Sequence, residues 1–69
     1  MPLTFATPGI PVQIQTILGK DETRRFLGNL GFVQGESVTI VSSFNGNLIL
    51  NIKDTRVALS RQMAQRIMV

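Results

Sequence analysis

The sequence of 69 residues contains no cysteine, histidine, tyrosine or tryptophan. Without thiols and imidazoles, the chain lacks the groups that form disulfides and the commonest zinc sites. Histidine is also the side chain that most often transfers protons in catalysis, and a nucleophile needs a base beside it. We therefore expect no catalytic residues and no enzyme activity, and the fold must be held by packing and hydrogen bonds.

Carboxylates and sulfur atoms are also scarce. The four acidic residues stand next to predicted turns or helix starts, where Asp21 and Asp54 have structural explanations. Hard cations need several clustered oxygens, whereas softer metals favour thiolate and imidazole. The three methionines are expected to fill gaps in the core. The sequence therefore predicts no metal site and no cofactor.

Long hydrophobic runs and an export signal are both missing. The longest aliphatic runs, such as Leu48-Ile49-Leu50, fall far short of the roughly 20 residues that cross a bilayer as a helix. The first residues lack the basic start, apolar run and cleavage site of a signal peptide. We expect a cytoplasmic protein without membrane insertion.

The basic residues do not gather in one part of the sequence. The net charge is +3, but the seven lysines and arginines are scattered, and several stand close to acidic residues. This pattern favours an ordinary solvated surface. A nucleic-acid-binding barrel, the alternative, would need stacking aromatics beside a basic groove. Of the four phenylalanines, Phe26 and Phe32 are predicted in the core, which leaves Phe5 and Phe44, so we expect no nucleic acid partner.

The most informative stretch runs from Arg24 to Gly35 and predicts a short helix that a glycine stops. We expect the helix at about residues 21–30, with Asp21 as its N-cap and Gly31 in the left-handed conformation just past its end. Phe32 should then fold back on Leu27, as usually happens at such helix ends. Leu30 is predicted to be in the core, and Gly35 marks the turn into a strand that begins near Val38.

Before this helix, the sequence predicts an extended arm followed by a strand. Residues 1–11 carry three prolines and Gly9, which predicts an extended arm anchored by Leu3 and Phe5, or else a frayed end. Apolar and polar residues alternate from Val12, which predicts a strand that ends in a bend.

After the helix, the alternation predicts a meander of three strands. Asn45-Gly46 is a strong hairpin signal, and a three-residue loop or an equivalent bulge would pair Phe44 with Leu48 and Ile40 with Ile52. An even loop around Asp54-Thr55 would pair Ile52 with Val57 and Leu50 with Leu59. Both registers keep the apolar residues on one face.

The end of the sequence predicts one helical turn and a last strand. Ser60 can cap a turn at about residues 61–65, with Leu59 against Ala64, and Ile67 and Val69 alternate after it. We therefore predict one mainly β domain over residues 1–69, a small, partly closed antiparallel barrel of about five strands.

Because no catalytic residue, metal site or cofactor is predicted, the candidates for functional residues are surface residues that could bind a partner. We predict partner-binding residues at Arg24 and Arg25 on the helix, and at Phe44, Asn45, Gly46 and Asn47 on the hairpin tip. The arm is a third candidate surface.

The sequence resembles the FeoA family, the small ferrous iron transport proteins A of bacteria. The most specific part is Leu30-Gly31-Phe32 followed by Gly35 and Val38. The other matching residues are Leu3, Pro8, Gly9, Val12, Ile14, Arg24, Leu27, Val57, Ala58, Leu59, Ala64, Gln65, Arg66, Ile67 and Val69. The resemblance implies an SH3-like β-barrel with an inserted helix.

The resemblance also implies a function without enzyme activity. It implies a role in Fe²⁺ uptake through contact with FeoB, a membrane transporter with a cytoplasmic GTP-binding part, which would hold the protein at the periphery of the inner membrane. Transition metal ion binding is implied for the family only, with no residue of this chain assigned to it. Many relatives carry an Ala-Pro and Gly-Asp-Pro pattern at the hairpin tip, whereas this chain has Ser43-Phe44-Asn45-Gly46-Asn47.

Two alternatives remain at this point besides nucleic acid binding. A similar SH3-like module forms the C-terminal part of iron-dependent repressors, so the same fold serves regulation as well. The module could also self-associate weakly through edge strands, as small sheets do when an edge stays unpaired.

Overall fold

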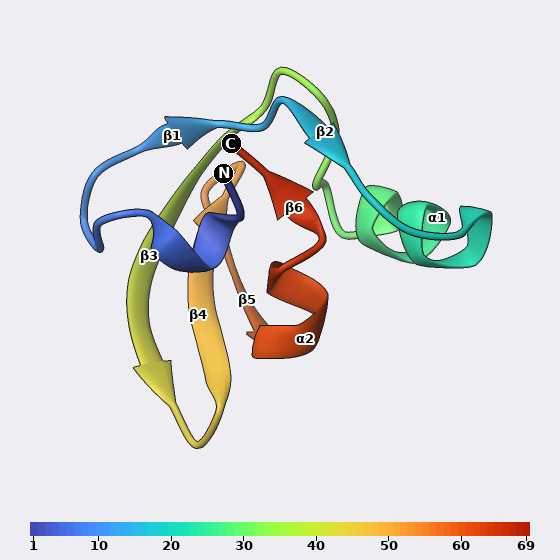
Figure 1. Cartoon of the computed structure of the whole chain (residues 1–69). Helices are drawn as coiled ribbons and strands as arrows, with labels where there is room; N and C mark the ends of the chain where they lie inside the picture. The colour runs from blue at the N-terminus through green and yellow to red at the C-terminus, as the bar shows by residue number, and fades with distance from the viewer.

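The computed structural model describes residues 1–69, and its elements follow one another through two antiparallel sheets and two helices (Figure 1). In chain order they are the 3-10 turn η1 (Leu3–Phe5), β1 (Val12–Gln13), β2 (Thr16–Ile17), α1 (Asp21–Asn29), β3 (Ser37–Phe44), β4 (Asn47–Ile52), β5 (Thr55–Ser60), α2 (Arg61–Ala64) and β6 (Ile67–Met68). None of the helices has the length and apolarity needed to span a bilayer.

The predicted mainly β, antiparallel fold is confirmed, but the strands do not close into a barrel. One sheet has the order β1-β3-β4-β5 and the other pairs β2 with β6. The predicted first strand is split by its bend, so that β1 joins the large sheet and β2 joins the small one. The split gives six strands where about five were predicted. Because no ladder connects β5 to the small sheet, the strands form no continuous barrel.

Helix α1 begins without the predicted side-chain cap. Lys20 occupies the N-cap position in extended conformation and makes no cap hydrogen bond, so the prediction of Asp21 as the cap is wrong. The chain turns into the helix at Gly19, with φ at +118°, and this places Asp21 inside the first turn. There its carboxylate and that of Glu22 face the positive end of the helix dipole.

The end of α1 confirms the predicted glycine stop. Gly31 has φ at +102°, and its N–H donates to the carbonyl of Gly28 at 3.0 Å. The N–H of Phe32 donates to the carbonyl of Leu27, also at 3.0 Å. These two bonds form a Schellman motif, and Leu27 and Phe32 are both buried in the same core.

The β3–β4 hairpin has the predicted bulge but not the predicted pairs. Asn45 and Gly46 both have positive φ, at 50° and 78°, and form a two-residue turn that pairs Phe44 with Asn47. The register then shifts between Ile40 and Ser42, so Ile40 pairs with Leu50 instead of Ile52. Because Asn-Gly favours the two-residue turn, the extra residue, Val41, is accommodated within the strand.

The β4–β5 hairpin has a loop with an even number of residues, as predicted, but the loop is shorter than predicted. Lys53 and Asp54 form its two-residue turn, which pairs Ile52 with Thr55 and Leu50 with Val57, so the predicted Ile52–Val57 and Leu50–Leu59 pairs are wrong. The apolar residues still share one face because the shift is by two positions. Both turn residues are left-handed without being glycine, with φ at 50° and 61°.

The C-terminal elements follow the prediction closely. Helix α2 ends one residue earlier than expected, and the Ser60 hydroxyl accepts a hydrogen bond from the Met63 N–H at 3.2 Å, as an N-cap does. Leu59 and Ala64, on either side of this cap, are both buried. Strand β6 pairs with β2, so the last strand does find an open edge.

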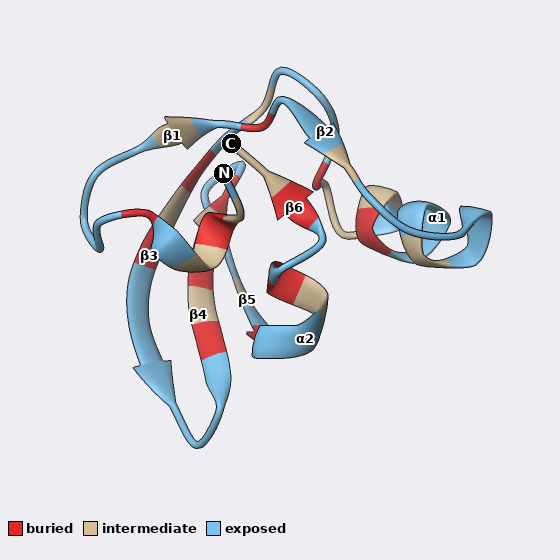
Figure 2. Cartoon of the chain, viewed as in Figure 1, coloured by how far each residue is buried: buried red, intermediate tan, exposed pale blue.

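A single core of 13 buried side chains, all apolar, holds these elements together (Figure 2). Its members are Leu3, Ala6, Ile14, Leu27, Phe32, Val38, Ile40, Leu48, Leu50, Ile52, Leu59, Ala64 and Ile67. The predicted burial of Phe26 is wrong, because this ring lies on the flank of α1 and is 49% exposed. Leu30 is only half-buried, against the edge of the core.

The first eleven residues dock on the body rather than forming an extended arm throughout. Leu3 is fully buried, as predicted, but Phe5 is 73% exposed because η1 turns the two side chains apart. Pro2 bridges to Met68, and the Gly9 N–H donates to the carbonyl of Ile40 at 2.8 Å. This segment is therefore fixed at both of its ends.

Leu50→Ala tests the core. Leu50 is fully buried, so we expect the substitution to lower the free energy of unfolding by about 2 to 5 kcal/mol, because it removes apolar contacts and leaves a cavity. Urea denaturation followed by circular dichroism measures this. Ile10→Ala, at a site that is 55% exposed, should change stability by less than about 1 kcal/mol. Equal effects of the two substitutions would contradict the placement of the core.

The turn at Lys53 and Asp54 gives a prediction of opposite sign. The double change Lys53→Asn, Asp54→Gly installs residues that accept positive φ and should raise the free energy of unfolding by about 1 kcal/mol. It also removes the 3.6 Å ion pair between Lys53 Nζ and Glu36 Oε1, an exposed pair worth about 0 to 1 kcal/mol. Glu36→Gln, which removes only the ion pair, is the control, and a less stable double variant would refute the prediction.

Candidate functional site

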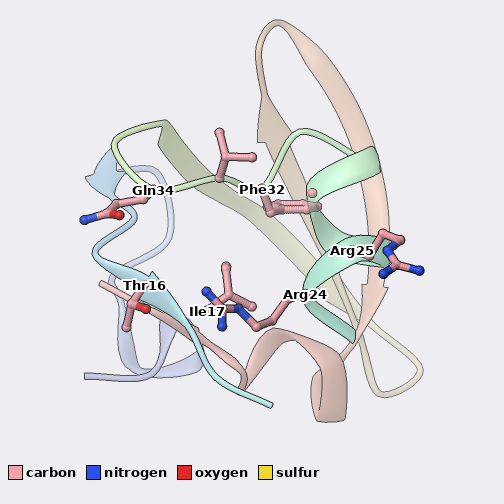
Figure 3. A pocket seen from close by; sticks show the side chains of 8 residues that line it. Thr16, Ile17, Arg24, Arg25, Phe32 and Gln34 are labelled. Atoms are coloured by element: carbon pink, nitrogen blue, oxygen red, sulfur yellow. The ribbon is translucent and has the colours of Figure 1, made fainter. Parts of the chain in front are cut away.

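A hollow of about 310 Å³ lies between β2 and α1 (Figure 3). Three segments surround it: strand β2, one flank of α1, and the loop that leads from the end of α1 toward β3. The residues that line it are Thr16, Ile17, Arg24, Arg25, Gly28, Phe32, Val33 and Gln34.

Local sequence explains why these segments meet. Strand β2 is held in place by its pairing with β6, and only Leu18, Gly19 and Lys20 separate it from the start of α1. The Schellman motif then returns the chain, so that Phe32 enters the core while the next two residues lie at the surface. The hollow is therefore formed by the bend at one end of α1 and the glycine stop at the other.

The two arginines of α1 are placed differently. Figure 3 shows Arg24 extending beside Ile17 into the hollow, whereas Arg25 turns away toward the outer side of the helix. Successive helical residues point about 100° apart, which accounts for the divergence. Neither guanidinium forms an ion pair, since the one ion pair of the chain joins Lys53 and Glu36. Arg24 therefore offers an uncompensated positive charge at the edge of the hollow.

The other lining groups suit binding rather than reaction. Ile17 and Val33 provide aliphatic surface, while Thr16 and Gln34 add a hydroxyl and an amide on the opposite side of the hollow from α1 (Figure 3). No carboxylate lines the hollow, and no group of His, Cys, Asp or Glu in the chain is arranged to hold a metal ion. A guanidinium beside apolar surface matches a carboxylate that is flanked by apolar groups.

The hairpin tip is a separate surface. Phe44 is 68% exposed, and Asn45, Gly46 and Asn47 are exposed beside it. The tip ends the eight-residue strand β3, far from the end of that strand that follows α1. Figure 1 shows the tip and α1 as separate projections from the body. The structure therefore does not bring the two sets of predicted partner-binding residues together.

The remaining predicted motif residues serve the fold. Gly31 and Gly35 have positive φ, and Leu27, Phe32, Val38, Leu59 and Ala64 are buried. Sequence reasoning missed Thr16, Ile17, Val33 and Gln34 as lining residues. Their only signal was position, because they flank the bend after the first strand and the turn after Gly31, and neither alternation nor charge marks them.

Comparison with known proteins identifies the class of this fold. A family model of the FeoA domain matches residues 1–69. A crystal structure of an iron uptake regulatory protein (FeoA) shares 27% identity over all of this chain and 93% of that one, with a TM-score of 0.91. Zinc-complexed FeoA of Stenotrophomonas maltophilia, described as a prokaryotic SH3 domain protein, shares 28% identity over all of this chain and 88% of its own, with a TM-score of 0.85.

Two further structures contain the same fold within longer chains. Iron(II) transport protein A from Clostridium thermocellum shares 27% identity over 99% of this chain and 43% of its own, with a TM-score of 0.90. IdeR of T. acidophilum, at 21% identity over all of this chain and 32% of its own, shares the fold, with a TM-score of 0.86. No curated protein sequence matches the chain.

These comparisons define a small SH3-like module of the kind found in iron-related proteins. The chain belongs to the FeoA family, whose model covers its whole length. The resemblance found in the sequence is thereby confirmed, and family membership supports a role in ferrous iron transport.

Proposed function

We propose that this protein is a non-enzymatic accessory component of ferrous iron uptake that binds the cytoplasmic part of the FeoB transporter and modulates its activity or assembly. The FeoA match over residues 1–69 carries the proposal. It is supported by the absence of histidine and cysteine and by a surface hollow lined with binding groups rather than reactive ones. The protein would act at the cytoplasmic face of the membrane, held there by its partner.

The hollow between β2 and α1 is the contact surface that we assign to the transporter. Arg24 would donate charge-assisted hydrogen bonds to a carboxylate of the partner, and Ile17 would pack against the apolar part of the same segment. The lower dielectric beside apolar surface strengthens the Coulomb attraction within such a pair, and complementary charges also steer association. Arg25, which points away from the hollow, would contribute through its longer-range positive charge.

The hairpin tip from Phe44 to Asn47 is the second contact that we assign. The exposed aromatic ring of Phe44, at the end of β3 and directly before the two-residue turn, is a suitable anchor for a partner pocket. The tip lacks the proline-containing pattern of many relatives, so a transporter recognised by this chain would need a pocket that accepts the Phe44 ring.

A regulatory module, as in iron-dependent repressors, is the alternative reading. It is supported by the fold shared with IdeR of T. acidophilum, a likeness that concerns the fold alone. The two hypotheses differ in the partner that they require. The accessory protein must bind a transporter, whereas the regulatory module must contact a DNA-binding protein.

Charge reversal on α1 tests the proposed interface. Arg24→Glu should weaken binding to the cytoplasmic part of the cognate FeoB by about tenfold or more, about 1.4 kcal/mol, because it places a carboxylate against a carboxylate. Arg25→Glu should weaken binding less, and the double variant should not bind. Titration calorimetry or a pull-down with quantified fractions measures these affinities.

Arg61→Glu is the matched control, since Arg61 is exposed on α2 and is not among the residues that line the hollow. This variant has the same charge change and should bind like the native protein. No binding by the native protein would refute the proposed partner. Equal loss in all three single variants would refute the hollow as the interface and leave only a general effect of charge.

GTP hydrolysis by the matching FeoB gives the second test. Addition of the native protein should change the turnover rate, and addition of the Arg24→Glu, Arg25→Glu double variant should leave it unchanged. A rate that is unaffected by saturating native protein would contradict modulation of the nucleotide cycle and leave a role in assembly.

A further inference from the structure

The outer edge of β5 is an unpaired sheet edge. β5 is the last strand in the order β1-β3-β4-β5, and no hydrogen bond joins its outer side to another element. Its six residues, Thr55–Ser60, contain no proline, no glycine and no bulge. Natural sheets commonly protect their edges with proline, bulges, charged side chains or a covering element, because an open edge readily pairs with another strand. Of these features, β5 carries only the charged side chain of Arg56.

The other edges of the two sheets are short, paired or interrupted. β6 has β2 on one side and the bridge from Pro2 on the other. The half of β3 beyond Ile40 also lacks a neighbour on its outer side, but it starts at the bulge and ends at the hairpin turn. β1 and β2 have two residues each. Strand addition is therefore best accommodated along β5.

The register of the β4–β5 hairpin shows which groups of β5 point outward. A two-residue turn makes Ile52 and Thr55 a hydrogen-bonded pair, and such pairs alternate along an antiparallel ladder. Val57 and Leu59 therefore direct their N–H and C=O groups toward β4. Arg56 and Ala58 direct theirs to the open edge.

The side chains of β5 are arranged to match a second copy of the same strand. About a two-fold axis at Ala58, antiparallel pairing sets Ala58 opposite its counterpart, Val57 opposite Leu59, and Arg56 opposite Ser60. Val57 and Leu59 lie on the core face of the sheet, as their pairing with Leu50 and Leu48 shows, so this register places apolar residues against apolar ones. The register keeps the two Arg56 side chains from lying opposite each other, where like charges would destabilise the pair.

We propose that two copies of this chain associate through their β5 strands, antiparallel and centred on Ala58, to form one continuous eight-stranded sheet. The association is weak, because it rests on a short backbone ladder with little apolar burial and both copies carry a net charge of +3. It uses neither the hollow at α1 nor the hairpin tip, and it does not depend on the proposed transporter partner.

The first test is sedimentation equilibrium of the isolated protein from about 10 μM to about 1 mM. This concentration range populates a dimer with a weak dissociation constant. The average mass of the native protein should rise toward that of a dimer. Backbone amide exchange followed by NMR should show slower exchange at Arg56 and Ala58 as the concentration rises. A monomer mass over the whole concentration range overturns the proposal. It does so even if the β5 edge binds a strand of another protein, because the proposal names a second copy of this chain as the partner.

Charge variants at Ala58 test the register and the identity of the partner. The Ala58 side chain is exposed, so Ala58→Lys and Ala58→Glu should each fold, and each should associate at least about tenfold more weakly because identical charges meet at the two-fold axis. An equimolar mixture of the two variants should associate at least as well as the native protein. If both variants associate like the native protein, or if the mixture stays monomeric, the proposal is wrong.

Ala58→Pro removes the outward N–H and should abolish association, while Ala58→Val keeps that N–H and should preserve it. Proline is tolerated at an edge position whose N–H faces solvent, and a thermal unfolding curve checks that the variant folds. Ser42→Lys, which adds the same charge as Ala58→Lys on an exposed residue of β3 away from this edge, should leave association unchanged. Association of a folded Ala58→Pro variant at native strength also overturns the proposal.

Discussion

The structure depends on one constraint, the alignment of apolar side chains on β4 with those of both neighbouring strands. Leu48, Leu50 and Ile52 are buried in alternation with half-buried residues, so β3 and β5 must present their own apolar residues to the same side. The chain has no disulfide, so no covalent cross-link fixes the strand register in place of packing. Packing of the 13 core side chains therefore selects the fold.

Two different solutions satisfy this constraint in the two hairpins. Between β3 and β4, the favourable two-residue turn at Asn45-Gly46 would by itself place the apolar residues of the two strands on opposite faces. The bulge at Val41 brings them back to one face. Between β4 and β5, the parity is right, but residues other than glycine take positive φ at Lys53 and Asp54. In the first hairpin the irregularity lies in the strand, and in the second it lies in the turn.

Sequence patterns predicted the elements well because each pattern reflects a local cause. The glycine stop at Gly31, the Ser60 cap and the period-two strands all act within a few residues, and they appear where expected. The registers were wrong because alternation alone does not show whether a longer loop or a bulge within the strand keeps the apolar residues on one face. The burial of Phe26 was wrong because the rotation of a helix depends on the packed structure. The hollow was missed for the same reason. It joins Thr16 and Gln34, which are far apart in sequence, and their segments are held together by the backbone hydrogen bonds of Ile14 with Gly35 and Glu36.

The two ends of the chain lie side by side, which has a consequence for how this unit combines with others. The Met1 amino group donates to the Val69 carbonyl at 2.9 Å, and the Val69 N–H donates to the Met1 carbonyl at 2.8 Å. A domain whose ends meet can be spliced into a surface loop of a host protein through two short connectors, without stretching either partner. The same adjacency means that joining the ends and opening the chain at an exposed turn, such as Asn45-Gly46, should leave the core residues in place.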